Sequence, residues 1–197
     1  IVLTPELQLV LGGRFDLGTQ YYLNRLPGSK TVPPEQQLFG ASPRVGLIYR
    51  PFEPLTFYAS YATAFTPQTA NLLNVTNPPP ETAEQIEVGT RIDVNPDLTL
   101  SAAAFRITRD NVAANDPVNT GFSIITGQQR SEGVEADVAG AILPGWKVIG
   151  GVGYLDARIT KDKIFPVGNR LIGVPAFSGS VWTTYDFLEG PLRGLGL

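Results

Sequence analysis

The sequence predicts an all-β protein, an antiparallel up-and-down meander that forms part of a large transmembrane β-barrel. Three observations predict this fold. Apolar residues recur at every second position, short turns alternate with longer polar loops, and aromatic residues gather near the ends of the predicted strands. Strands with one apolar face, joined by short turns on one rim and long loops on the other, are typical of outer-membrane barrels.

The composition excludes several classes of function. The 197 residues include no His and no Cys, which removes thiolate and imidazole ligands and the commonest general base. The chain has no apolar run of the ~18–20 residues that a membrane helix needs, and its net charge of −3 gives no reason to expect a nucleic-acid partner. We therefore expect no catalytic residue, no metal site and no cofactor.

The turns and loops follow in strict alternation along the chain. Breaker residues predict short turns at 4–6, 51–54, 95–97, 143–145 and about 188–194. Longer polar loops are expected at about 24–40, 66–82, 111–121 and 161–173. The chain starts and stops within strands, so the whole of 1–197 is expected to be one piece of a barrel domain, with about eight strands or partial strands.

The faces of the predicted strands follow from the period of two. One face should carry apolar side chains toward lipid on the convex side, and the other should carry polar side chains toward a wet lumen. The apolar set is Val45, Leu47, Phe57, Tyr61, Ile86, Val88, Val134, Val138 and Tyr185, and the polar set is Glu87, Arg91, Glu135 and Asp137.

The predicted strand over 98–109 does not fit this pattern. Leu98 and Leu100 share one face, whereas Phe105 and Ile107 fall on the other. A β-bulge or a different register within this strand is the expected reason.

Aromatic residues lie where the membrane interfaces of a barrel should be. Trp146 follows a short turn, and Tyr154 lies eight residues further along the same face. Such rings form the aromatic girdles of membrane barrels, although aromatic residues also favour strands in general.

Two carboxylate groupings invite a functional interpretation, and neither supports one. Asp110, Asn111, Asn115 and Asp116 lack the glycine and the spacing of an EF-hand loop, so they indicate a solvated loop. Glu132 and Glu135 fall on opposite faces of their strand, so they cannot form a paired-carboxylate site.

A series of motifs runs through nearly the whole chain. It comprises GGRFD at 12–16, SPRVGLIYRP at 42–51, YASYATAFTP at 58–67, PETAEQIEVG at 80–89, AFRITRDNV at 104–112, GQQRSEGVE at 127–135, and VP at 174–175 leading into SVWTTY at 180–185. In this order and spacing they resemble the later barrel strands of TonB-dependent outer-membrane receptors, most closely the ferric-siderophore group.

The resemblance implies a 22-stranded barrel, an N-terminal plug that fills it, and a coupling segment that meets the TonB complex. We expect the plug, the coupling segment and the C-terminal end of the barrel to lie outside this chain. The family imports ferric siderophores or similar large chelates across the outer membrane of Gram-negative-type bacteria. The implied partners are therefore the ferric siderophore, the TonB complex and outer-membrane lipid.

Three functions stay open at this point. The first is a segment of a TonB-energised active transporter, the second a passive porin, and the third a soluble β-rich binding module. No family motif assigns a ligand contact by residue in this chain. The candidate binding regions are therefore the predicted loops 66–82, 111–121 and 161–173.

Overall fold

A computed structural model describes residues 1–20, 35–69, 72, 78–125, 127–162 and 164–197 of the chain. Its long strands are β1 (Leu7–Gln20), β2 (Gln36–Phe52), β3 (Leu55–Thr66), β4 (Glu81–Asn95), β5 (Leu98–Asp110), β8 (Gln128–Leu143), β9 (Trp146–Lys161) and β10 (Phe177–Tyr185). Two short strands, β6 (Ala113–Asn115) and β7 (Ser123–Ile125), lie between β5 and β8.

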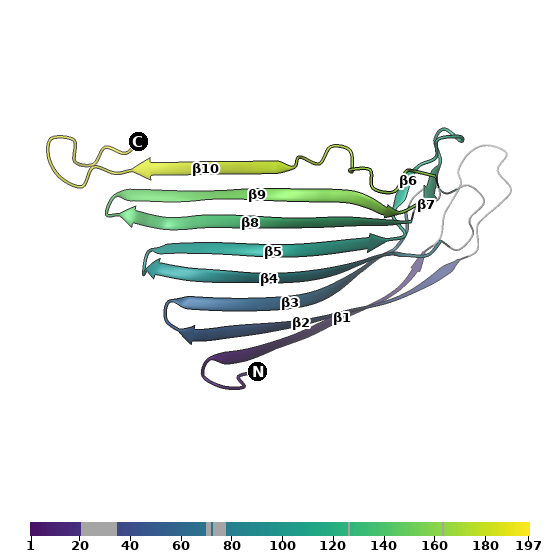
Figure 1. Cartoon of the computed structure of the whole chain (residues 1–197), viewed down its shortest axis with the longest axis horizontal. Coiled ribbons are helices and arrows are strands. Elements are labelled where there is room, and N and C mark those ends of the chain that lie inside the picture. The colour runs from purple at the N-terminus through teal and green to yellow at the C-terminus, as the bar shows by residue number, and fades with distance from the viewer. Residues whose placement is uncertain (21–34, 70–71, 73–77, 126, 163) are drawn as a thin grey trace.

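The long strands form one antiparallel sheet in chain order, β1-β2-β3-β4-β5-β8-β9-β10. Figure 1 shows the short turns β2–β3, β4–β5 and β8–β9 together at one end of the sheet and the long connections at the other. The predicted meander and its two unequal rims are therefore confirmed. The β6–β7 hairpin, which lies within the long connection from β5 to β8, was not predicted.

The register of the sheet confirms the predicted faces. Directly opposed residues on neighbouring antiparallel strands share a face, and Val45 pairs with Tyr61, which pairs with Ile86. The next row places Val88 beside Ala104 and Val134. Following the register across the sheet puts all nine predicted apolar residues on one face, and Glu87, Arg91, Glu135 and Asp137 on the other.

The predicted bulge within 98–109 is wrong. Residues Leu98 to Asp110 pair without interruption with Gly140 to Gln128 of β8. The register shift lies just before this strand, between Asp93 and Asn95 of β4. Phe105 does lie on the polar face, because Gly133 on β8 leaves room there for its ring: a Cβ added at Gly133 would stand 2.8 Å from the Phe105 Cζ atom.

Two of the predicted loop boundaries also need correction. The loop expected at 24–40 ends earlier, because β2 already begins at Gln36, and residues 21–34 lie outside the described part of the chain. The connection expected at 111–121 extends to residue 127 and contains the β6–β7 hairpin.

The sheet is a single layer. The accessible surface of the chain is 13700 Å², whereas a compact monomer of 21.2 kDa would expose roughly 9,100 Å². Among the described residues, Val112 and Ala157 are the buried apolar side chains. The apolar face is therefore left open instead of forming a core.

Within the described residues, no helix is long and apolar enough to cross a membrane.

Candidate functional site

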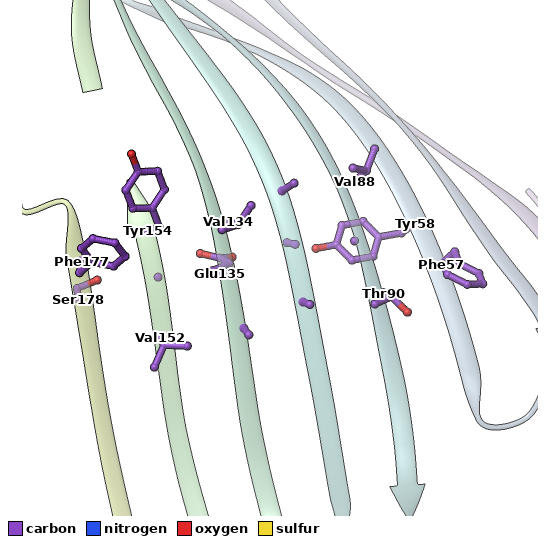
Figure 2. Close-up of a pocket in the computed structure, with 16 residues that line it drawn as sticks. Phe57, Tyr58, Val88, Thr90, Val134, Glu135, Val152, Tyr154, Phe177 and Ser178 are labelled. Atoms are coloured by element: carbon purple, nitrogen blue, oxygen red, sulfur yellow. The ribbon is translucent and has the colours of Figure 1, made fainter. Parts of the chain in front are cut away.

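The polar face centres on Tyr58 and Glu87. The Tyr58 hydroxyl donates a 2.7 Å hydrogen bond to Glu87 Oε1, and Gln85 Nε2 donates a 2.8 Å bond to Glu87 Oε2. The Tyr58 ring reaches Glu87 by lying across β4 (Figure 2), which is possible because Gly89 has no side chain there. Two neighbours therefore fix the position of this carboxylate.

Three carboxylates lie around Tyr58 on this face. Glu87, Glu135 and Asp137 all act electrostatically on its hydroxyl. Among the described residues, none of the three forms an ion pair, and no group of carboxylates is arranged to hold a metal ion. The centre of the polar face is thus a patch of three carboxylates that form no ion pair within the described sheet.

The polar face differs toward the short turns. Arg91 forms a 2.9 Å ion pair with Asp93, and Thr99 donates a 2.8 Å hydrogen bond to the same carboxylate. Arg91 and Asp93 therefore balance each other at this end of the face.

The opposite face carries a shallow apolar hollow of about 950 Å³. Its floor is formed by alanines of β5 and β8, and Figure 2 shows Val88, Val134, Val152, Tyr154 and Phe177 around it. The Tyr154 and Phe177 rings are 4.9 Å apart between centroids. Since this lining is almost wholly apolar, the hollow suits hydrocarbon and not a polar chelate.

Two of the three candidate loop regions contact each other. Leu72 and Ser123 form a parallel bridge, Gln68 Nε2 donates to the Asn111 carbonyl at 3.2 Å, and Asn111 Nδ2 donates to the Pro80 carbonyl at 2.8 Å. Regions 66–82 and 111–121 are thereby joined above the loop-side rim, although residues 70–71 and 73–77 are not described.

The third candidate region, 161–173, folds back on its own strand. The Ile159 amide donates to the Asn169 carbonyl, and the Leu171 amide donates to the Ala157 carbonyl, each at 2.9 Å. These two hydrogen bonds run to β9, whereas the other two regions share contacts with each other.

The tip of the β6–β7 hairpin is held by Asp116. Its Oδ2 atom accepts a 2.8 Å hydrogen bond from Asn119 Nδ2, and its Oδ1 atom accepts the backbone amides of Asn119 and Val118. These bonds, that of the Asn119 side chain foremost, lower the pKa of the Asp116 carboxyl below its usual value. The four polar residues around 110–116 thus include a turn-stabilising carboxylate, in keeping with the predicted solvated loop.

The arrangement defines a class of protein. A single antiparallel layer with one open apolar face, one polar face and all long loops on one rim is a segment of the wall of a transmembrane β-barrel. The chain belongs to the TonB-dependent receptor-like β-barrel family, whose model matches residues 1–197. Members of this family lie in the outer membrane of Gram-negative bacteria.

Several characterised proteins are similar to this chain. The metal-pseudopaline receptor CntO of Pseudomonas aeruginosa is 31% identical over 94% of the chain and 27% of its own length. The ferrichrome outer membrane transporter/phage receptor of Escherichia coli is 31% identical over 98% of the chain and 25% of its own length. The solved structure of the siderophore receptor PiuA from Acinetobacter baumannii matches with a TM-score of 0.77 at 26% identity, over 93% of the chain and 29% of that structure.

The chain therefore spans about a quarter of the length of the curated relatives that it matches. Family membership also assigns the two faces of the sheet. The apolar face meets lipid, the polar face with Glu87, Glu135 and Asp137 meets the lumen, and the rim with the long loops is the extracellular one.

Proposed function

We propose that the chain is part of the barrel of a TonB-energised active transporter that imports ferric siderophores or a similar large chelate. The proposal is supported by relatives whose names specify ferrichrome, ferrioxamine B and metal-pseudopaline. The observation that carries it is the uncompensated negative patch of Glu87, Glu135 and Asp137 on the luminal face. In an open pore, water and salt would screen these charges. In a barrel filled by a plug, the same carboxylates can pair with basic side chains on the plug surface.

The luminal patch is proposed to bind basic side chains of the plug that the family resemblance implies. Glu87 is suited to this role because Tyr58 and Gln85 hold both of its oxygens in place. A carboxylate oxygen can accept more than one hydrogen bond, so each remains open to an arginine from the lumen. The candidate chelate-binding regions stay 66–82, 111–121 and 161–173, at the extracellular rim.

The import function is tested in the intact receptor. Uptake of radiolabelled ferric siderophores by cells that carry the receptor gene should require TonB, and uptake should end when TonB is deleted. Entry that is equally fast without TonB would indicate a passive porin and contradict the proposal.

The role of the luminal patch is tested separately. Glu87→Gln together with Glu135→Gln should weaken the contact between the barrel wall and the plug. A large antibiotic, which the outer membrane normally excludes, should then enter the cell. The control is Glu189→Gln, which removes one negative charge from the exposed turn after β10. Unchanged antibiotic resistance in the double variant, at normal receptor levels, would rule out this role for the patch.

A further inference from the structure

Charged residues gather on the lipid-facing side of the sheet at its extracellular end. Ala104, Val134 and Tyr154 lie side by side on neighbouring strands of this face. The next lipid-facing row toward the loops consists of Arg106, Glu132 and Asp156. One row further out, Arg130 lies opposite Arg158. Charge on this face costs ~2–4 kcal/mol at the centre of the bilayer and falls to about 0–1 near the interface, so the depth of these residues matters.

Aromatic rings mark that depth. Trp146 and Tyr185 are directly paired at the short-turn end of the lipid face, and Tyr154 and Phe177 are directly paired toward the loops. Eight residues of strand separate the two pairs, which corresponds to a height of roughly 20 Å for a strand tilted by ~40°. The charged residues begin just beyond the second pair and therefore lie at the level of the lipid headgroups.

Six side chains make up this outer arginine cluster: Arg106, Arg130, Arg158, Arg170, Glu132 and Asp156. Glu132 lies 2.5 Å from Arg106 Nε and 3.3 Å from Arg130 Nε. Asp156 lies 2.8 Å from Arg158 Nε and 3.5 Å from Arg170 Nε. The four cations and two anions of the cluster sum to a net charge of +2, and Glu84 lies on the same face in the row of Arg130.

The cluster also contains guanidinium N–H donors that bind no described residue. Arg106 and Arg130 both direct Nε toward Glu132, and the Nη atoms of these two residues donate no hydrogen bond to any described residue. Their side chains are 57% and 44% exposed. Arg170 arrives from the 161–173 connection, where its Nη2 donates to the Leu155 carbonyl at 3.1 Å. The guanidinium forks of Arg106 and Arg130 are thus held at their base and open at their tips, whereas Arg158 and Arg170 each use one Nη atom to bind a backbone carbonyl.

We propose that this outer arginine cluster binds the phosphate groups of lipid headgroups in the extracellular leaflet. Guanidinium forks match phosphate oxygens in a bidentate geometry. The apolar hollow below the cluster, bordered by Val134 and Tyr154, lies where the acyl chains of the same lipid would run. The occupant is a membrane lipid because the cluster continues the lipid-facing surface and lies outside the lumen.

The test uses the complete receptor in neutral phosphatidylcholine nanodiscs. Purified bis-phosphorylated lipid A is titrated in, and binding is followed by native mass spectrometry. Arg106→Gln and Arg130→Gln should each weaken binding roughly fivefold, since one cation near an anionic headgroup contributes about that much. Glu132→Gln should strengthen binding, because it raises the net charge of the cluster and frees two forks.

Matched controls separate binding from folding. Arg193→Gln removes a cation from the turn at the opposite rim and should leave lipid affinity unchanged. The melting temperature of every variant in phosphatidylcholine alone reports its fold. Cluster variants that bind like Arg193→Gln would overturn the proposal. So would inorganic phosphate that displaces the lipid at equal concentration, or a Glu132→Gln variant that binds more weakly than the parent.

Discussion

The ring of Tyr58 on β3 occupies the space above Gly89 on β4. A β-carbon at Gly89 would stand 2.5 Å from the Tyr58 Cε1 and Cζ atoms, closer than any packed carbon can approach. Phe105 and Gly133 repeat the arrangement between β5 and β8. Large rings on the luminal face are therefore seated over glycines of the neighbouring strand, and the Tyr58 ring carries its hydroxyl to Glu87.

Replacement of Gly89 by alanine should displace the Tyr58 ring and break its hydrogen bond to Glu87. Overpacking of this kind costs about 1–3 kcal/mol. We expect the melting temperature of the complete receptor to fall, and a Tyr58→Ala background to remove most of that loss because the ring is then gone.

Gly46→Ala is the matched control for Gly89. Its added β-carbon would find its nearest neighbour at 3.6 Å, an ordinary contact, so stability should change little. Equal losses of stability at both positions, or a Gly89→Ala loss that Tyr58→Ala does not relieve, would mean that the ring does not lie over Gly89 as described.

Val138→Arg should prevent assembly of the complete receptor. Val138 lies on the lipid face opposite Leu100 and Gly150, and Gly150 lies midway between Trp146 and Tyr154 along β9. An arginine at the centre of the membrane costs ~2–4 kcal/mol. The amount of folded receptor in outer-membrane fractions measures the effect, and assembly at the level of the parent would contradict the assignment of the faces.

Ser60→Arg provides the control for that substitution. Ser60 lies opposite Glu87 on the luminal face, where water and a carboxylate can receive the new charge. We expect this variant to assemble far better than Val138→Arg.

The 197 residues expressed alone should not form a stable soluble monomer. Within the described sheet, β1 and β10 each have one edge without a partner strand, and such edges are adhesive in water. The open apolar face adds to this tendency. Light scattering on detergent-free material should show aggregates or edge-paired oligomers, and a monodisperse 21.2 kDa species would contradict the single-layer fold.

The β6–β7 hairpin should lose order in acid. Because the pKa of Asp116 is lower in the folded hairpin than in an unfolded chain, this carboxylate stabilises the turn above the ordinary aspartate value of ~3.9. The stabilisation disappears as the pH falls from there through the lowered pKa. Hydrogen exchange of residues 116–122 in the receptor should therefore be faster in Asp116→Ala than in the parent near pH 6, and the two rates should approach each other as the pH falls below the ordinary aspartate value toward the lowered pKa of Asp116.

Much of the fold could be predicted from the sequence because the strand period is local. The apolar residues at 45, 47, 86 and 88 identify a face without any knowledge of their neighbours. The position of Phe105 could not be resolved in this way, because what makes room for its ring is Gly133 on another strand. In the sequence alone, an apolar ring on the polar face of a strand looks like a break in the alternation. Only the pairing with the next strand explains it.

The charged sites were missed for a related reason. Arg106 is 26 residues from Glu132 and 64 from Arg170, and their meeting depends on the register of three strands and the path of a loop. The Tyr58–Glu87 bond likewise joins residues 29 apart. One signal could have indicated the Tyr58–Glu87 pair. It is an aromatic residue on one strand and, on the next strand, a glycine two residues from a carboxylate.

The irregular positions of the sheet bear on how such chains change during evolution. The register shifts lie between Tyr49 and Phe52, Asp93 and Asn95, Gln128 and Gln129, and Ala141 and Leu143, in each case close to a strand end. One inserted residue in mid-strand would turn every later side chain to the wrong side of the wall, whereas an insertion at these ends is absorbed locally. Length differences accumulated by descent should therefore be confined to the two rims, leaving the membrane-crossing middle of each strand constant in length while its residues diverge.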